Sequence, residues 1–201
     1  MENAIMEKLK SQAKNLKILS EELQVQMALG KAEARDLIEK ERKNLSKYMD
    51  YQRKEFAKAE NISNENRRNF LTCVENLETV LFKEIPVNPK EYDAYKNDIL
   101  NKVYKLEEEV RNNYPSMNEK MQETLDAFKV KMDAFRVNLA LHDKDNPEKV
   151  EKIRNEFTEK LSAIRKTLDG KEQAQSKLDS FVEDISESFD YLKRAIADLS
   201  N

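Results

Sequence analysis

Glycine and proline are nearly absent from this chain, which holds two glycines and four prolines in 201 residues. A sheet protein of this length needs many turns, and turns depend on glycine, proline, Asn-Gly or Asp-Gly. Lys, Glu, Leu and Ala, which favour helices, are abundant instead. The sequence therefore predicts an all-α fold of long helices.

Apolar residues recur at alternating steps of four and three, the spacing of a coiled-coil seam. The clearest run is Met121, Leu125, Phe128, Met132, Phe135 and Leu139. Val130, Val137 and Leu141 widen its apolar face, which favours packing against more than one helix. We expect an elongated antiparallel helical bundle or coiled coil.

Turn and capping signals divide the chain into six expected helices. Ser63 is a candidate N-cap, and Asn-Pro pairs at 88–89 and 146–147 place an N-cap residue before a proline at the first helical position. The expected helices cover residues 3–59, 64–84, 89–113, 117–142, 148–169 and 172–199. The first is expected to run without a break through Gly30, whereas the chain should break at 143–147.

Two segments of the chain resemble each other at a spacing of 112 residues. Residues 16–29 align with 128–141, and their apolar positions coincide, most densely in Val25-Gln-Met-Ala-Leu29 and Val137-Asn-Leu-Ala-Leu141. Chance similarity between heptads is the alternative explanation. We interpret the chain as two related halves, 1–88 and 115–201, joined by a connecting helix at 89–114.

Residues 24–36, with Gly30-Lys-Ala-Glu-Ala-Arg-Asp36, resemble a loose group of bacterial coiled-coil proteins, some labelled apolipoprotein-like or stress-response proteins. Phe189-Asp-Tyr-Leu-Lys193 is similar to the end of those proteins, with Phe where Trp is usual. The resemblance implies a cytoplasmic helical protein, linked to stress, with no assigned catalytic residues.

Residue counts argue against catalysis and cofactors. His142 is the only histidine, too few for a di-iron or Cys/His zinc site, and two glycines cannot form a phosphate-binding loop. We expect His142 to end a helical seam and Cys73 to be a small buried residue rather than a reactive thiol. No catalytic, cofactor-binding or metal-binding residue is predicted, so we expect a protein that is not an enzyme and has no cofactor or small-molecule substrate.

Charge and hydropathy narrow the expected partners. The net charge is −3, and the basic clusters at 40–43 and 67–68 are interleaved with acids, so we expect no nucleic-acid partner. The N-terminus lacks an apolar signal segment, and no apolar run would span a membrane, so we expect a cytoplasmic protein. The sequence favours a structural or protein–protein interaction role, with self-association into a homo-oligomer. The alternative is peripheral binding of membrane or lipid surfaces by residues 16–29.

Overall fold

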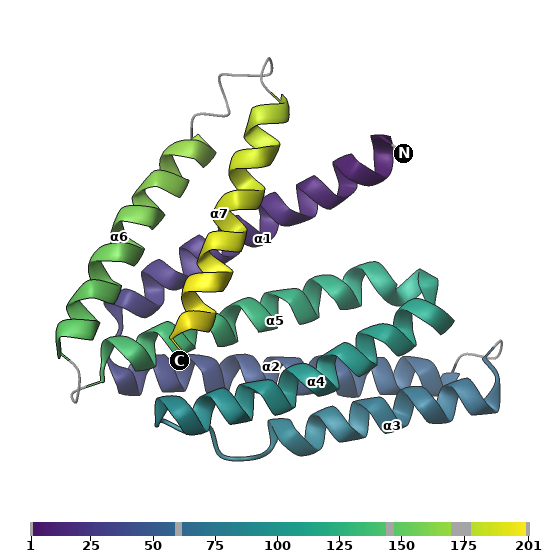
Figure 1. Cartoon of the computed structure of the whole chain (residues 1–201). Coiled ribbons are helices and arrows are strands. Elements are labelled where there is room, and N and C mark those ends of the chain that lie inside the picture. The colour runs from purple at the N-terminus through teal and green to yellow at the C-terminus, as the bar shows by residue number, and fades with distance from the viewer. Residues whose placement is uncertain (1, 59–61, 144–146, 170–177, 200–201) are drawn as a thin grey trace. The chain divides into compact units, whose positions relative to one another are not determined.

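The computed structural model describes residues 2–58, 62–143, 147–169 and 178–199, and within these ranges it is built from seven α-helices and contains no strand (Figure 1). The helices are α1 (Glu2–Ala28), α2 (Lys31–Lys58), α3 (Asn64–Leu81), α4 (Pro89–Asn113), α5 (Pro115–Leu141), α6 (Pro147–Asp169) and α7 (Leu178–Asp198). The prediction of an all-α helical bundle is confirmed. A single elongated antiparallel bundle with two related halves stays a prediction.

The expected helix caps are present where the sequence places them. The Ser63 hydroxyl accepts a hydrogen bond from the main-chain N–H of Asn66 at 3.1 Å. The Asn88 carboxamide oxygen accepts from the N–H groups of Lys90 and Glu91, with Pro89 at the first position of α4. These caps satisfy donors that a helix cannot pair internally, and they fix where α3 and α4 begin.

The expected continuous helix over 3–59 is wrong, because the chain leaves the helix at Leu29 and Gly30. The N–H of Leu29 still donates to Val25, whereas the carbonyl of Gly30 accepts the first hydrogen bond of α2 from Ala34 at 3.0 Å. The Gly30 N–H donates to the Glu33 carboxylate at 3.0 Å, which completes an N-terminal cap for α2. Helix α5 ends at Leu141 and α6 begins at Pro147, whereas residues 144–146 of the predicted break, and 172–177 of the expected last helix, lie outside the described residues.

The chain divides into two compact units, each described here by itself. Unit 1 comprises Met1–Ala34 and Asp133–Asn201, and unit 2 comprises Arg35–Met132. Both units are assembled from stretches that differ from the predicted domains 1–88, 89–114 and 115–201, and the predicted repeat is not settled by this division.

In unit 1, α1 packs against α6 and α7, which also pack against each other (Figure 1). Leucine side chains along the described part of α1 are buried, and so are apolar side chains along one side of α6 and at the end of α7. The buried apolar side chains of these helices include Leu16, Leu19, Leu23, Ile153, Phe157, Leu161, Ile164, Leu192 and Ile196. The last turns of α5 belong to this unit, and residues 133–141 are buried at every position.

In unit 2, α3 and α4 pack closely, and ion pairs join the helices at their edges. Arg53 of α2 pairs with Glu78 of α3, and Arg35, earlier in α2, pairs with Glu84, just beyond the end of α3. Residue numbers therefore rise along α2 as they fall along α3. These two helices therefore run in opposite directions. Lys131 of α5 pairs with Glu41 of α2 at 2.8 Å.

An aromatic cluster closes one end of unit 2. The rings of Phe56 and Phe70 stack with centroids 3.8 Å apart, and Tyr114 meets Phe56 edge-on at 4.5 Å. Offset and edge-on ring pairs are favourable beyond the area that they bury. The cluster holds α2 and α3 together where the connection α4–α5 passes.

Candidate functional site

The most exposed large apolar side chain of the described residues is that of Phe82, in the turn between α3 and α4. Its side chain is 74% exposed, and Val87 in the same turn is 37% exposed. Ile85 between them is 2% exposed, so it anchors the turn in the core. Residues 82–88 form the α3–α4 turn.

Hydrogen bonds from main-chain and side-chain groups fix both ends of the α3–α4 turn. The Phe82 N–H donates to Glu78 at 3.0 Å and the Lys83 N–H to Val80 at 3.1 Å, which ends α3 in a tight turn. The Arg42 guanidinium donates to the Lys83 carbonyl. At the other end of the turn, the Asn88 cap begins α4. The turn is thus held by hydrogen bonds at both of its ends, beside Phe82 and at Asn88.

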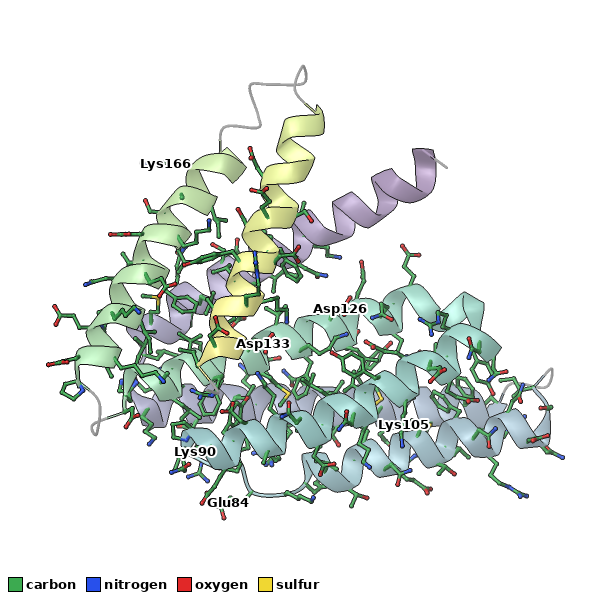
Figure 2. The ribbon with its side chains drawn as sticks, in the orientation of Figure 1. Glu84, Lys90, Lys105, Asp126, Asp133 and Lys166 are labelled. Carbon is green, nitrogen blue, oxygen red and sulfur yellow. The ribbon has the colours of Figure 1, made fainter. Side chains whose placement is uncertain are left out.

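Charged side chains border the α3–α4 turn. The Lys83 ammonium lies 3.1 Å from the Asp98 carboxylate, and Arg35 lies 3.0 Å from the Glu84 carboxylate. Glu84, labelled in Figure 2, is 85% exposed. An exposed aromatic residue followed along the chain by paired charged residues has the residue types found at the centre and rim of protein interfaces.

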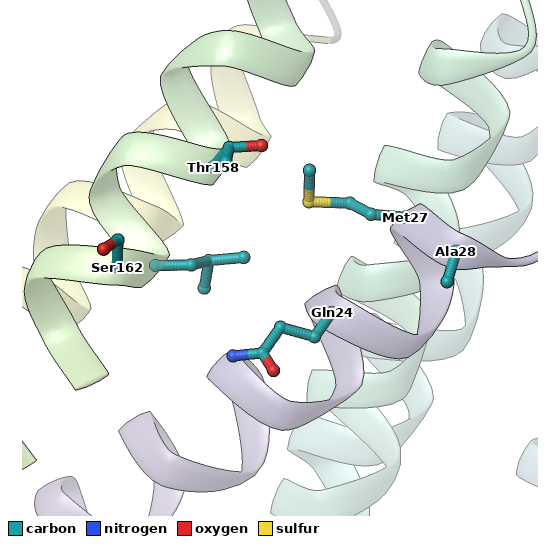
Figure 3. Close-up of a pocket in the computed structure, with 6 residues that line it drawn as sticks. Gln24, Met27, Ala28, Thr158 and Ser162 are labelled. Carbon is teal, nitrogen blue, oxygen red and sulfur yellow. The ribbon is translucent and has the colours of Figure 1, made fainter. Parts of the chain in front are cut away.

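A crevice of about 410 Å³ opens between α1 and α6 within unit 1 (Figure 3). The residues that line it are Gln24, Met27, Ala28, Thr158, Leu161 and Ser162. Three of these residues are apolar, two carry small hydroxyl groups and one carries an amide, and none of them is charged. The crevice marks where α1 and α6 are less tightly packed, and it brings no catalytic set together.

Two buried polar side chains of α5 bind the end of α7. The Asp133 carboxylate, labelled in Figure 2, pairs with the Lys193 ammonium. The Arg136 guanidinium is 3% exposed and donates to the main-chain carbonyl of Leu199 at 2.6 Å. A cation beside the last carbonyls of a helix is favourable because those groups lack partners in the helix. Sequence periodicity alone did not identify this contact, since both residues interrupt the apolar seam.

A third buried polar side chain of α5 binds the end of α1. The Asn138 amide nitrogen donates to the main-chain carbonyls of Gln26 at 2.7 Å and Leu29 at 3.0 Å. Asn138 and Gln26 are 0% and 1% exposed, and their side-chain oxygens accept no hydrogen bond from the described residues. Asn138 therefore supplies partners that the last turn of α1 lacks.

Cys73 and His142, the two residues that were tested for chemistry in the sequence, do not line the crevice between α1 and α6. Cys73 is half-buried rather than buried, and burial, with a smaller contribution from Glu109, raises the pKa of its thiol. His142 follows α5, and its Nδ1 donates to the main-chain carbonyl of Asn138 at 2.9 Å. The surroundings of both residues are explained by the packing and hydrogen bonding of the helices that carry them.

Two ionisable clusters carry shifted pKa values. Burial lowers the pKa of Lys129, but hydrogen bonds to Asp126 and Glu107 outweigh burial and raise it. A hydrogen bond from Tyr191 to Glu156, at 2.6 Å, raises the pKa of that phenol to about 12. In both clusters each ionisable group pairs with an oppositely charged group or with a hydrogen-bonding partner, as is typical of contacts that stabilise a fold.

Among the described residues, no group of three or more His, Cys, Asp or Glu side chains is arranged to hold a metal ion. None of the helices in the described ranges is both long and apolar enough to cross a membrane. The chain matches no protein-family model, no curated protein and no solved structure.

Proposed function

We propose that this chain is a non-catalytic interaction protein that binds another protein through the α3–α4 turn. The observation that carries the proposal is the exposure of Phe82, 74%, on a backbone fixed at both ends of the turn. Aromatic side chains on rigid elements dominate binding energy at protein interfaces because little conformational entropy is lost. The partner is expected to offer an apolar pocket that takes one aromatic ring.

The apolar seams that suggested self-association are occupied within the chain. Leu16, Leu19 and Leu23 of α1 are buried in unit 1, and Leu125 and Phe128 of α5 are also buried. Binding through those seams would require the helices to separate. The α3–α4 turn needs no such change, which favours it as the contact surface.

The peripheral membrane alternative is weakened for the same reason. Residues 16–29 were its basis, and the three leucines that lead their apolar side, Leu16, Leu19 and Leu23, are buried, whereas Val25 is 46% exposed and the other apolar side chains of the segment are half-buried or exposed. If α1 left the unit to bind a membrane, the free energy of membrane binding would have to exceed the cost of exposing the apolar sides of α6 and α7 to water. Co-sedimentation with vesicles of anionic lipid tests this alternative, and strong binding by the folded chain would favour it over the proposal.

The proposal includes several finer features. We place the protein in the cytoplasm and keep the two related halves, the elongated antiparallel arrangement and the homo-oligomer as parts of the same proposal. The resemblance to bacterial stress-response coiled-coil proteins extends it to a role in stress. Raised abundance of the protein under heat or oxidative stress would support that last part.

The test compares Phe82→Ser with Tyr51→Ser, because Tyr51 is another exposed aromatic residue, 56% exposed, on α2. Proteins that co-purify with each tagged chain are quantified, and a candidate is then purified and titrated against both variants. Loss of a central aromatic contact is expected to weaken binding about 30-fold, whereas Tyr51→Ser should change it less than threefold. Equal recovery and equal affinity for both variants would contradict the proposal.

A further inference from the structure

The exposed side of α2 carries a row of lysines that is interrupted by one aromatic ring. Its members are all exposed, and they are Lys40, Lys43, Lys47, Tyr51 and Lys54. They follow one another at steps of three or four residues, so they lie on one side of the helix over about 21 Å. These five residues form the lysine stripe.

Acidic residues alternate with these lysines in the sequence and argue there against a nucleic-acid partner, but in the structure each of these acids is half-buried and paired with a cation. The pairs are Glu39 with Arg35 at 3.3 Å, Glu41 with Lys131 at 2.8 Å, and Asp50 with Lys54 at 2.7 Å. Within residues 37–53, all of which are described, no acidic side chain is exposed. The outer side of α2 is therefore more basic than the sequence suggests.

Three lysines of the stripe keep an uncompensated charge. Lys40, Lys43 and Lys47 form no ion pair with any of the described residues. Lys54 shares its charge with Asp50, in an exposed pair of the kind that contributes little. Interactions between exposed charges are screened beyond about 10 Å at 0.1 M salt, so the local charge of the stripe outweighs the net charge of −3 for a ligand that approaches α2.

Tyr51 lies between Lys47 and Lys54 along the stripe, and its side chain is 56% exposed. Ammonium groups bind phosphates, and an exposed aromatic ring stacks with an unpaired base, so the combination is typical of sites for single-stranded nucleic acid. A duplex would leave the ring unused, because its bases are already stacked on each other. Helix α2 also cannot enter a major groove, since the Arg53–Glu78 and Lys131–Glu41 pairs join it to α3 on one edge and α5 on another.

We propose that the lysine stripe binds single-stranded nucleic acid, with phosphates against Lys40, Lys43 and Lys47 and a base stacked on Tyr51. These contacts recognise the phosphate and the face of a base, so they select no base sequence, and RNA and DNA strands should bind alike. The stripe contains no residue of the α3–α4 turn. The proposal is therefore independent of the function proposed for that turn, and Phe82→Ser should bind nucleic acid as the wild type does.

The first test measures the fluorescence anisotropy of labelled oligothymidylate and oligouridylate, titrated with the full chain. The slope of log affinity against log salt should be about −2, because three phosphate contacts each contribute about −0.7. A combined Lys40→Gln, Lys43→Gln and Lys47→Gln variant should bind at least about tenfold more weakly and bring the slope close to zero. The control is Lys149→Gln, Lys152→Gln and Lys166→Gln, which removes the same charge from exposed positions of α6 and should weaken binding less than about twofold.

The second test isolates the aromatic ring. Tyr51→Leu should weaken oligonucleotide binding about tenfold, whereas Tyr51→Phe keeps the ring and should bind as the wild type does. Inorganic polyphosphate, which has no bases, should bind the wild type and Tyr51→Leu equally. Circular dichroism shows that each variant is folded.

Several outcomes would overturn the proposal. They are no binding of either oligonucleotide, an equal loss of affinity in the α2 and α6 lysine variants, and unchanged binding by Tyr51→Leu. Stronger binding to vesicles of anionic lipid or to a polyglutamate peptide than to the oligonucleotides would also overturn it, because the stripe would then serve a lipid surface or an acidic protein.

Discussion

Asn138 caps the end of a helix that lies 112 residues earlier in the chain, because its side-chain amide donates to the main-chain carbonyl of Gln26 at 2.7 Å. The same amide reaches the carbonyl of Leu29 at 3.0 Å. One buried polar side chain thus satisfies two carbonyls beside the break at Gly30. It helps to decide where α1 ends.

Replacement of Asn138 by Ala is expected to destabilise the protein by about 2 kcal/mol, because a buried carbonyl at Gln26 and a half-buried one at Leu29 lose their donor. Urea denaturation followed by circular dichroism measures the loss. Asn113→Ala is the control, since Asn113 is exposed and bonds only to Glu109 of its own helix. A change below about 0.5 kcal/mol for Asn138→Ala would contradict the capping role.

Two Tyr→Phe substitutions should act in opposite directions. The buried Tyr92 hydroxyl donates to the Met132 carbonyl at 2.9 Å, so Tyr92→Phe is expected to cost about 1 kcal/mol. The buried Tyr114 hydroxyl has no hydrogen-bond partner among the described residues, so Tyr114→Phe is expected to be neutral or to stabilise by about 0.5 kcal/mol. Thermal and urea unfolding of both variants check this, and clear destabilisation by Tyr114→Phe would show an unrecognised partner.

Lys129→Met is expected to destabilise the protein by about 2 kcal/mol at neutral pH, because it leaves Glu107 and Asp126 beside each other without their cation. The pKa of Lys129 is raised above its ordinary value of 10.5. Its contribution is therefore complete at neutral pH and is lost as the pH rises through the folded-state pKa. The difference in unfolding free energy between wild type and variant should shrink above pH 10.5, and a difference that persists there would argue for packing instead.

Tyr191 should ionise later than an ordinary tyrosine, with a pKa of about 12. The main cause is its hydrogen bond to Glu156, so Glu156→Gln should return the pKa towards 10.0. Any stability from this bond is present below the ordinary pKa and disappears as the pH rises from 10.0 to about 12. Ultraviolet titration of wild type against Tyr191→Phe isolates this phenol. Ionisation near pH 10.0 in the wild type would refute the contact.

Much of the fold could be predicted because local signals agree with it. The caps at Ser63 and Asn88 and the proline that starts α6 mark helix ends that depend on nearby residues alone. Gly30 was missed because one glycine among helix-favouring residues costs a helix only about 1 kcal/mol. Packing of α1 and the distant Asn138 decide that break, and neither is visible in a local window.

The candidate site was harder to predict. The expected helix over 64–84 ran through Phe82, whereas α3 ends at Leu81. The sequence did hold a signal for the exposure of Phe82. Leu81 and Phe82 are adjacent, and two adjacent residues cannot both lie on the buried face of one helix. Leu81 continues the seam of Phe70, Val74 and Leu77, so Phe82 had to point elsewhere. Its exposure depends on the turn that follows, which the sequence pattern does not specify.

The central claim is that a protein partner binds the α3–α4 turn, and amide hydrogen exchange of the complex tests it most directly. Residues 82–88 and the adjoining ends of α3 and α4 are expected to exchange more slowly when the purified partner is bound, and Phe82→Ser should abolish that protection. Protection confined to other helices, or unchanged protection in Phe82→Ser, would contradict the claim.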